Sequence, residues 1–197
     1  MIVFETERLR VRVATAVDAD LLYELWHDPR VMSNVGFPQG LRITWEEIVT
    51  SLVQHAPTQV FDRYLVVELQ ETREVIGECK LGTPDEAGIC ETDVKLLPRF
   101  WGHKFGIEVK RGLVDYLFAY TDCTAVQATP NVNNPASIHM QEAVGGVRVG
   151  ETVFEFPEVM QAYTATVHAY IYHVYRENWQ VTNSQSHKAD EISSFTE

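Results

Sequence analysis

The stretch from Glu91 to Glu108, ETDVKLLPRFWGHKFGIE, decides the fold. Its pattern predicts a strand, a turn that contains a proline, and a long helix that begins near His103. Gly102 and Gly106 flank the start of that helix. A helix start offers free backbone N–H groups and the positive end of the helix dipole, and glycine lets a ligand approach closely. The stretch therefore predicts a phosphate-binding turn, with an ordinary strand-to-helix turn as the alternative.

The cations Arg99, His103 and Lys104 near this turn suit an anionic ligand. The turn matches neither G-x-G-x-x-G nor G-x-x-x-x-G-K-[ST]. Nicotinamide dinucleotides and Walker-type ATP binding therefore have no support from a fingerprint.

Further along the chain, hydrophobic periodicity predicts helices first, then strands, then an alternation of the two. This order is typical of a mixed α/β sheet with helices on both faces. The segment 29–43, rich in Gly and Pro, is expected to be a loop. Strands are expected at 8–14, 64–69, 74–81, 89–97, 125–128, 146–153 and 167–174, and helices at 18–26, 44–54, 103–119 and 135–144.

Length and charge narrow the class of protein. The 197 residues are enough for one domain, which we place at 1–179, followed by a polar tail at 180–197. With 16 Lys and Arg against 28 Asp and Glu, the net charge of -12 argues against binding to nucleic acid or an anionic membrane. No apolar run reaches the roughly 20 residues of a membrane helix, and no secretory leader is visible, so a cytoplasmic location is expected.

The cysteines and histidines carry no metal or disulfide signal. Cys79, Cys90 and Cys123 are odd in number and lack a C-x-x-C pair, so we expect buried free thiols. His27, His55, His168 and His173 show no ligand spacing, and no metal is expected.

The predicted strand after the turn at 83–88 carries two acids. Alternation places Glu91, Asp93 and Lys95 on one face, with the carboxylates about 7 Å apart, and Lys95 is positioned to hold Asp93 ionised. Carboxylates in this position suit a general base for an ammonium substrate. The alternative is an exposed polar face with an ion pair.

Three motifs together resemble the GNAT superfamily of acetyl-CoA-dependent N-acetyltransferases, and within it the Rim-like branch that acetylates ribosomal proteins. Residues 100–108, FWGHKFGIE, lie on the family's pyrophosphate loop. Residues 5–12, ETERLRVR, resemble the first strand of the branch, and 134–137, NPAS, begin its last helical motif. Two positions depart from the pattern, because Lys104 replaces a glycine and Gln141 replaces the tyrosine that serves as the family's acid.

The resemblance implies a single GNAT-like domain whose mixed, mostly antiparallel twisted sheet is splayed at the central strand. It implies acetyl-CoA as co-substrate and direct transfer of the acetyl group to a primary amine, either a protein N-terminus or a small amine. Glu91 or Asp93 would be the base and Ser137 a proton donor. The assembly is left open between monomer and homodimer. The cofactor-binding residues that it implies are Val94, Lys95, Leu96, Trp101, Gly102, His103, Lys104, Phe105, Gly106, Ile107 and Asn134.

Two other classes of function stay open at this point. Lys104 and Gln141 leave room for a catalytically silent acyl-CoA-binding or regulatory module of the same fold. A binding domain without a CoA site is the third option.

Overall fold

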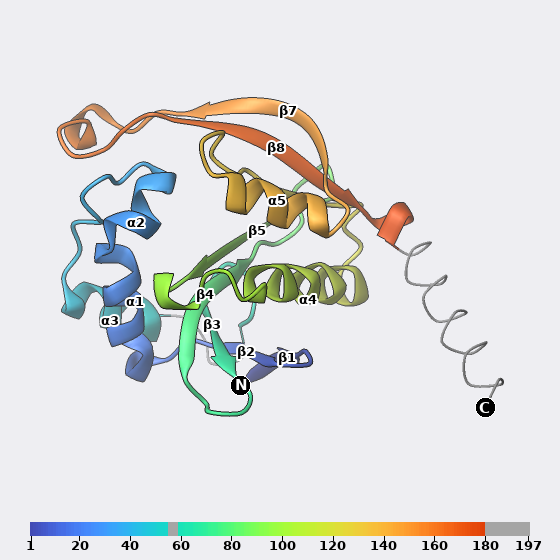
Figure 1. Cartoon of the computed structure of the whole chain (residues 1–197), viewed down its shortest axis with the longest axis horizontal. Helices are drawn as coiled ribbons and strands as arrows, with labels where there is room; N and C mark the ends of the chain where they lie inside the picture. The colour runs from blue at the N-terminus through green and yellow to red at the C-terminus, as the bar shows by residue number, and fades with distance from the viewer. Residues whose placement is uncertain (55–58, 180–197) are drawn as a thin grey trace.

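The computed structural model describes residues 1–54 and 59–179, so His55 and the predicted tail at 180–197 lie outside the described residues. Eight strands form one sheet in the order β1-β2-β3-β4-β5-β6-β8-β7, as Figure 1 shows. The predicted mixed, mostly antiparallel sheet is confirmed, since β5 and β6 are its parallel pair. The strands are β1 Ile2–Glu5, β2 Leu9–Val13, β3 Leu65–Leu69, β4 Val75–Leu81, β5 Ile89–Leu96, β6 Ala125–Ala128, β7 Val147–Phe154 and β8 Val167–Tyr175.

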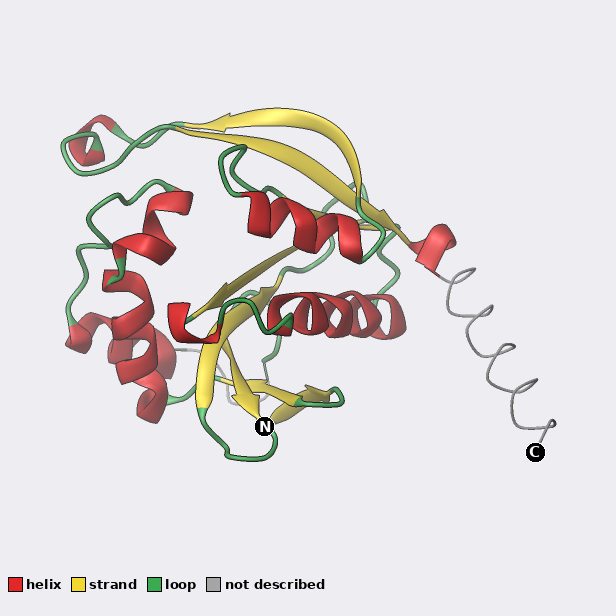
Figure 2. Ribbon diagram, in the orientation of Figure 1, coloured by secondary structure: helices red, strands yellow, loops and turns green. Residues whose placement is uncertain are grey.

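Helices cover both faces of the sheet, as Figure 2 shows by colour. One group lies to the left in that view and consists of α1 (Ala19–His27), α2 (Pro29–Met32) and α3 (Trp45–Val53). The other group is α4 (Phe105–Tyr120) and α5 (Pro135–Ala143).

The alternation of β3 builds two apolar cores. Leu65 and Val67 belong to the core beneath α4, whereas Val66 belongs to the core beneath α1 and α3. All three side chains are fully buried. The prediction of buried free thiols is confirmed for Cys79, Cys90 and Cys123, which all lie in the α4 core.

The sheet is open in its middle. β5 pairs with β4 from Thr92 to Leu96, but it pairs with β6 only from Ile89 to Glu91. Beyond Glu91 the two parallel strands diverge, which confirms the predicted splay at the central strand.

The predicted loop at 29–43 is wrong in its first part, because α2 occupies Pro29–Met32. Pro29 sits at the first helical position, where its fixed φ favours a helix, and the Asp28 carboxylate accepts a hydrogen bond from the Arg30 backbone N–H at 2.8 Å. The Asp-Pro pair that follows the predicted helix at 18–26 therefore starts a new helix.

Strand β1 at Ile2–Glu5 was not predicted. It is four residues long and pairs with β2 across an irregular register at the sheet edge. Such a strand depends on its neighbour and not on its own alternation, so the sequence pattern there is weak.

The long helix begins later than predicted. α4 starts at Phe105 and not at His103, because Lys104 adopts the left-handed conformation with φ of 64° and ends the turn that precedes the helix.

Candidate active site

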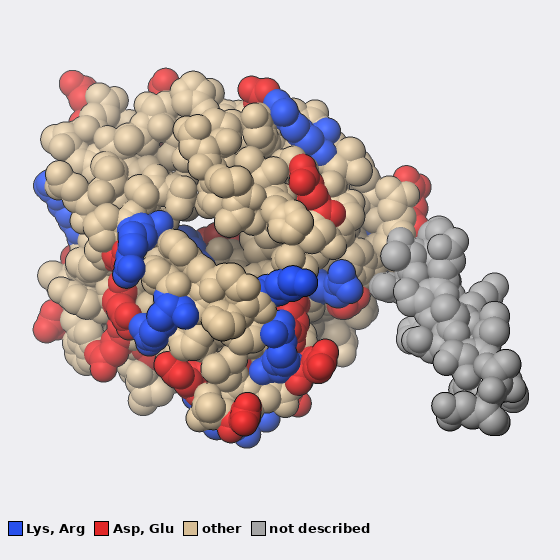
Figure 3. Space-filling view, viewed as in Figure 1, with Lys and Arg blue, Asp and Glu red and all other residues tan. Residues whose placement is uncertain are grey.

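A cavity of about 790 Å³ opens where β5 and β6 diverge. Figure 3 shows the hollow on the surface, in the region where Figure 1 places α5 on one side and the start of α4 on the other. It is lined by the second half of β5, the turn before α4, the first turns of α4 and α5, and residues around α2. All predicted site residues except His103 are among the residues that line it.

The backbone of β5 points alternately to its two sides. The Gly82 N–H donates to the Glu91 carbonyl at 2.8 Å and the Leu97 N–H donates to the Ile76 carbonyl at 2.9 Å, so the odd-numbered residues bond to β4. The alternation of an antiparallel strand then directs the amides of Val94 and Leu96 into the opening. Lys95 contributes its side chain to the cavity and directs its own amide to β4.

The indole of Trp101 bonds to a backbone carbonyl on this side of β5. Its Nε1–H donates to the Leu96 carbonyl at 2.8 Å, although the ring is 47% exposed. The Val94 amide and the Leu96 N–H remain as backbone groups aimed into the opening.

Glycine is required at both ends of the turn before α4, for different reasons. Gly102 has a φ of 82°, which side-chain-bearing residues rarely adopt. At Gly106, a Cβ would lie 3.1 Å from the Met140 sulfur of α5 and 3.9 Å from Leu96. Between them Lys104 has the conformation that glycine adopts freely, so the departure from the family pattern keeps the turn's shape.

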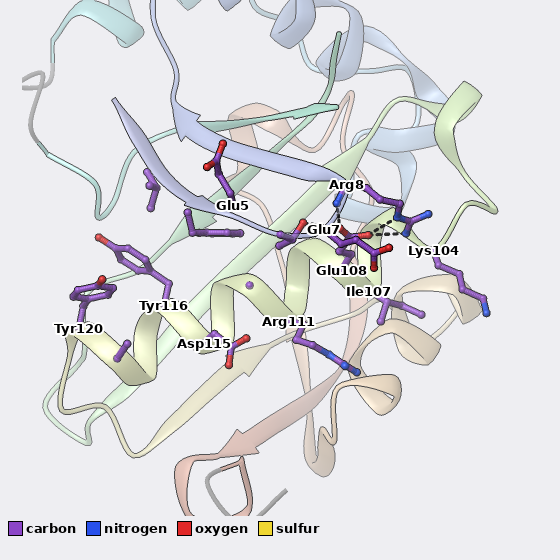
Figure 4. A pocket seen from close by; sticks show the side chains of 15 residues that line it. Glu5, Glu7, Arg8, Lys104, Ile107, Glu108, Arg111, Asp115, Tyr116 and Tyr120 are labelled. Atoms are coloured by element: carbon purple, nitrogen blue, oxygen red, sulfur yellow. Dashed lines mark hydrogen bonds and ion pairs between the residues drawn. The ribbon is translucent and has the colours of Figure 1, made fainter. Parts of the chain in front are cut away.

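The segment before β2 fixes this turn from outside the cavity. The Arg8 guanidinium donates to the His103 carbonyl at 3.2 Å and to the Glu108 carboxylate at 2.7 Å. The hydroxyl of Thr6 donates to the other Glu108 oxygen at 2.5 Å. Figure 4 shows the contact between Arg8 and Glu108, which lies in a separate groove of about 730 Å³ between β1, β2 and the outer side of α4. The Thr-Glu-Arg motif of the sequence therefore acts on the helix start.

The side chain of His103 lies away from the cavity. Its ring stacks on Phe105 at 5.6 Å between centroids, while its carbonyl accepts from Arg8. On the opposite wall, the Asn134 side chain caps α5 by accepting from the Ser137 backbone N–H at 3.1 Å. The cap fixes the α5 helix start at the cavity wall, and Ser137 is half-buried there.

The face of β5 toward α1 carries a paired set of charges. Lys95 contacts Asp93 closely and lies 3.3 Å from the Glu78 carboxylate, which accepts from the Trp26 indole at 2.9 Å. Burial would raise the pKa of Asp93, but the Lys95 ammonium outweighs it and the pKa lies below its ordinary value. Desolvation would lower the pKa of Lys95, yet the two carboxylates raise it. The prediction that Lys95 holds Asp93 ionised is confirmed.

Glu91 lies where β5 and β6 begin to diverge and has a different set of partners. Its carboxylate accepts from the Gln127 side chain on β6 at 2.7 Å. The Gln127 carbonyl oxygen in turn lies 2.9 Å from His173 Nε2 on β8. Because that oxygen only accepts, His173 donates from Nε2. Burial lowers the pKa of His173, which favours the neutral ring.

Three of these side chains escaped the sequence analysis. Gln127 and His173 reach Glu91 only through the pairing of β6 and β8, which no local pattern reveals. Lys110, on α4, is buried with 1% exposure and lines the cavity from the α4 side. The signal in the sequence was a lysine placed among the apolar residues on the buried face of the helix.

Within residues 1–54 and 59–179, no group of three His, Cys, Asp or Glu side chains is placed to hold a metal ion. Over the same residues, no helix has the length and apolar character needed to span a membrane.

The family described as "Acetyltransferase (GNAT) domain" matches residues 8–147, which include β2 through the start of β7. The chain belongs to this family. The curated N-acetyltransferase p20 of Bacillus licheniformis is 26% identical over 146 residues, 74% of this chain and 82% of that protein. These findings make the chain a GNAT acetyltransferase with acetyl-CoA as the co-substrate.

Solved GNAT structures share the fold. A spermidine N-acetyltransferase from Vibrio cholerae, in complex with CoA and spermine, superposes with a TM-score of 0.73 at 20% identity, over 89% of this chain and 99% of that one. A GNAT acetyltransferase from Bacillus anthracis superposes with a TM-score of 0.72 at 19% identity, over 90% of this chain and 99% of that one. A putative ribosomal-protein-serine acetyltransferase from Vibrio cholerae superposes with a TM-score of 0.69 at 14% identity, over 89% of this chain and 97% of that one.

Proposed function

We propose that this GNAT protein transfers an acetyl group from acetyl-CoA directly to a primary amine, with Glu91 as the general base. The observation that carries the proposal is the opening beside β5, which joins the turn before α4 on one side to two carboxylates on the other. Direct transfer requires both substrates to meet at one carbon atom, and the opening provides that meeting point.

The start of α4 would hold the CoA diphosphate. Gly102, Lys104 and Gly106 line the cavity there, and the helix start supplies free N–H groups and a favourable dipole. The amides of Val94 and Leu96 would pair with the thioester arm, and one of them would stabilise the oxyanion as the amine attacks. Asn134, Phe105, Ile107 and Trp101 complete the proposed cofactor wall.

Glu91 suits the role of base better than Asp93. Asp93 is already paired with Lys95, and its lowered pKa makes it a weaker proton acceptor. Glu91 is exposed and is oriented by one hydrogen bond from Gln127, so the other lone pairs of its carboxylate can accept a proton. Asp93 would then attract the ammonium form of the acceptor.

The acceptor is proposed as a small amine of the polyamine or aminoglycoside kind, or a protein N-terminus. The structures that share this fold include a spermidine N-acetyltransferase and an aminoglycoside acetyltransferase solved with kanamycin, at 20% and 19% identity. The putative ribosomal-protein-serine acetyltransferase supports the Rim-like branch and a protein N-terminus. The net charge of -12 favours cationic acceptors of either kind.

The test is acetyl transfer from acetyl-CoA to a panel of spermidine, kanamycin and a peptide with a free N-terminus. Release of CoA should depend on at least one of these amines, and an acetylated product should appear by mass spectrometry. The Glu91→Gln, Asp93→Asn double variant is the control, because it keeps the shape of both side chains. Binding of CoA without amine-dependent turnover would instead favour the silent CoA-binding module.

A further inference from the structure

Lys110 is a buried lysine that has no carboxylate partner among the residues that the structure describes. Its side chain is 1% exposed, on the face of α4 that packs on the sheet. Within residues 1–54 and 59–179 its one hydrogen bond is from Nζ to the Thr92 hydroxyl, at 2.5 Å. An ammonium group has three hydrogens to donate, so this environment satisfies it poorly.

The environment brings the lysine to a titrating state near neutral pH. Burial lowers the pKa of Lys110 to about 7, and the charge of Asp93 on β5 opposes that shift only in part. A buried lysine of this kind exchanges a proton readily, whereas an exposed lysine stays charged. Such a group costs stability unless a ligand uses it.

Its location matches the side of the opening from which sulfur must leave. Thr92 is the first β5 residue beyond the last pair with β6, so Lys110 Nζ lies at the start of the gap. Asp93, Lys95 and Glu78 lie on the α1 side of β5, while Lys110 approaches from α4. An acetyl thioester held between the strands would therefore have its amine acceptor on one side and Lys110 on the other.

We propose that Lys110 is the proton donor to the CoA sulfur in the acetyl transfer described above. The amine nitrogen forms a bond to the acetyl carbon, and Glu91 removes the proton that nitrogen loses. When the carbon–sulfur bond breaks, its electron pair goes to sulfur and a proton moves from Lys110 Nζ to that sulfur. Solvent then restores the proton on Lys110. The products are the N-acetyl amine and CoA thiol.

The cavity lacks a proton donor at the position where the family has one. The side chain at the family's acid position is Gln141, an amide that cannot supply a proton, and it is buried with 3% exposure. Ser137 is the proton donor expected from the sequence, and it offers a hydroxyl group. Its backbone N–H donates to the Asn134 side chain in the α5 cap. An ammonium group gives up a proton far more easily than a serine hydroxyl, so Lys110 takes precedence over Ser137.

The kinetic test compares Lys110→Met, Lys110→Arg and Ser137→Ala with Arg111→Met. Arg111 is the matched control because it is exposed on the same helix and lines the outer groove, as Figure 4 shows. Lys110→Met should lower kcat roughly 100-fold and change the KM for acetyl-CoA little. This loss is at the low end for a general acid, because a thiolate leaves fairly well without a proton. Lys110→Arg should also lose turnover, since arginine keeps its proton.

The pH profile separates a proton donor from a packing residue. Wild-type kcat should fall as the pH rises through the pKa of Lys110, and that basic limb should vanish in Lys110→Met. A kcat for Lys110→Met equal to that of Arg111→Met, an unchanged basic limb, or a larger loss in Ser137→Ala would each overturn the assignment.

A second test does not depend on finding the acceptor. CoA is bound to wild-type and Lys110→Met protein without any amine, and the thiol is titrated by the ultraviolet absorbance of its thiolate. A thiolate beside Lys110 favours its ammonium form, and this ion pair should make the thiol pKa lower in the wild type than in the variant. If the shift appears while no amine is acetylated, the acceptor proposal fails and the Lys110 placement stands. Equal thiol pKa values, or no CoA binding at all, would overturn the placement.

Discussion

Lys95, which is half-buried, and Lys110, which is buried, lie beside β5 on opposite sides of the sheet and in opposite electrostatic states. Lys95 contacts two carboxylates, Asp93 and Glu78, and its pKa is raised. Lys110 has a single hydroxyl partner, and its pKa is lowered to about 7. A paired buried charge is fixed in one protonation state, whereas a buried charge without a counter-ion is free to exchange its proton. In the function proposed above, the Lys95 side of β5 would attract the acceptor and the Lys110 side would take part in proton transfer.

The largest expected effect concerns the acceptor side. Glu91→Gln should lower kcat/KM for the amine about 10²- to 10³-fold, because the general base is lost, while CoA affinity stays the same. The loss should shrink at high pH, where more of the amine is already deprotonated in solution. Steady-state kinetics across the pH range measure both effects.

Asp93→Asn is the matched control for this prediction. It removes one carboxylate next to Glu91 on the same face and should have the smaller effect on turnover. A greater loss in Asp93→Asn than in Glu91→Gln would transfer the role of base to Asp93.

The same substitution at the two lysines should change stability in opposite directions, and the larger change is at Lys95. Lys95→Met leaves Asp93 and Glu78 without their shared cation, so the free energy of unfolding should drop by about 3 kcal/mol. Urea denaturation at pH 7 measures it. Since the pKa of Asp93 is lowered in the fold, its part of the wild-type stability is present above about pH 4 and is lost as the pH falls through its folded value. A stable Lys95→Met protein would show that the charged set is unimportant for folding.

Lys110→Met should instead raise the free energy of unfolding at pH 7, by about 2 kcal/mol, because it removes a buried ammonium without a counter-ion. The unfolded lysine binds a proton up to about pH 10, whereas the folded one loses it near pH 7. Wild-type stability should therefore rise between these pH values, and the variant should lack that rise. Urea denaturation at several pH values measures it. A loss of stability in Lys110→Met would contradict the contrast between the two lysines.

The smallest expected effect concerns the turn before α4. Lys104 has a φ of 64°, so Lys104→Gly should stabilise the protein by about 1 kcal/mol, as judged by urea denaturation. It should also weaken CoA binding at low salt through loss of a cation. Gly102→Ala is the opposite control, because its Cβ meets no atom within 4 Å and only the φ of 82° is strained. That variant should lose about 1 kcal/mol.

Local patterns predicted most of the elements, because they were periodic over enough residues. The alternation of Glu91, Asp93 and Lys95 placed them on one face, and the structure confirms it. β1 and α2 were missed because each is four residues long and depends on a neighbouring strand or on a cap. The start of α4 was misplaced because a lysine in the left-handed conformation leaves no mark in hydrophobic periodicity.

The candidate site was predicted only where the family motif or strand alternation pointed to it. Gln127 and His173 come from strands far along the chain, and their contacts to Glu91 follow from sheet order alone. Lys110 lies on the buried face of its helix together with Leu113 and Val114. A charged residue at a core position was visible in the sequence, but its partner Thr92 required the three-dimensional fold.

A crystal structure with acetyl-CoA bound tests the central claim most directly. The account predicts the diphosphate against the turn from Gly102 to Gly106, the thioester between β5 and β6 beside the Val94 amide, and its sulfur facing Lys110. Coenzyme bound in the outer groove between β1 and α4, with the opening beside β5 empty, would contradict it.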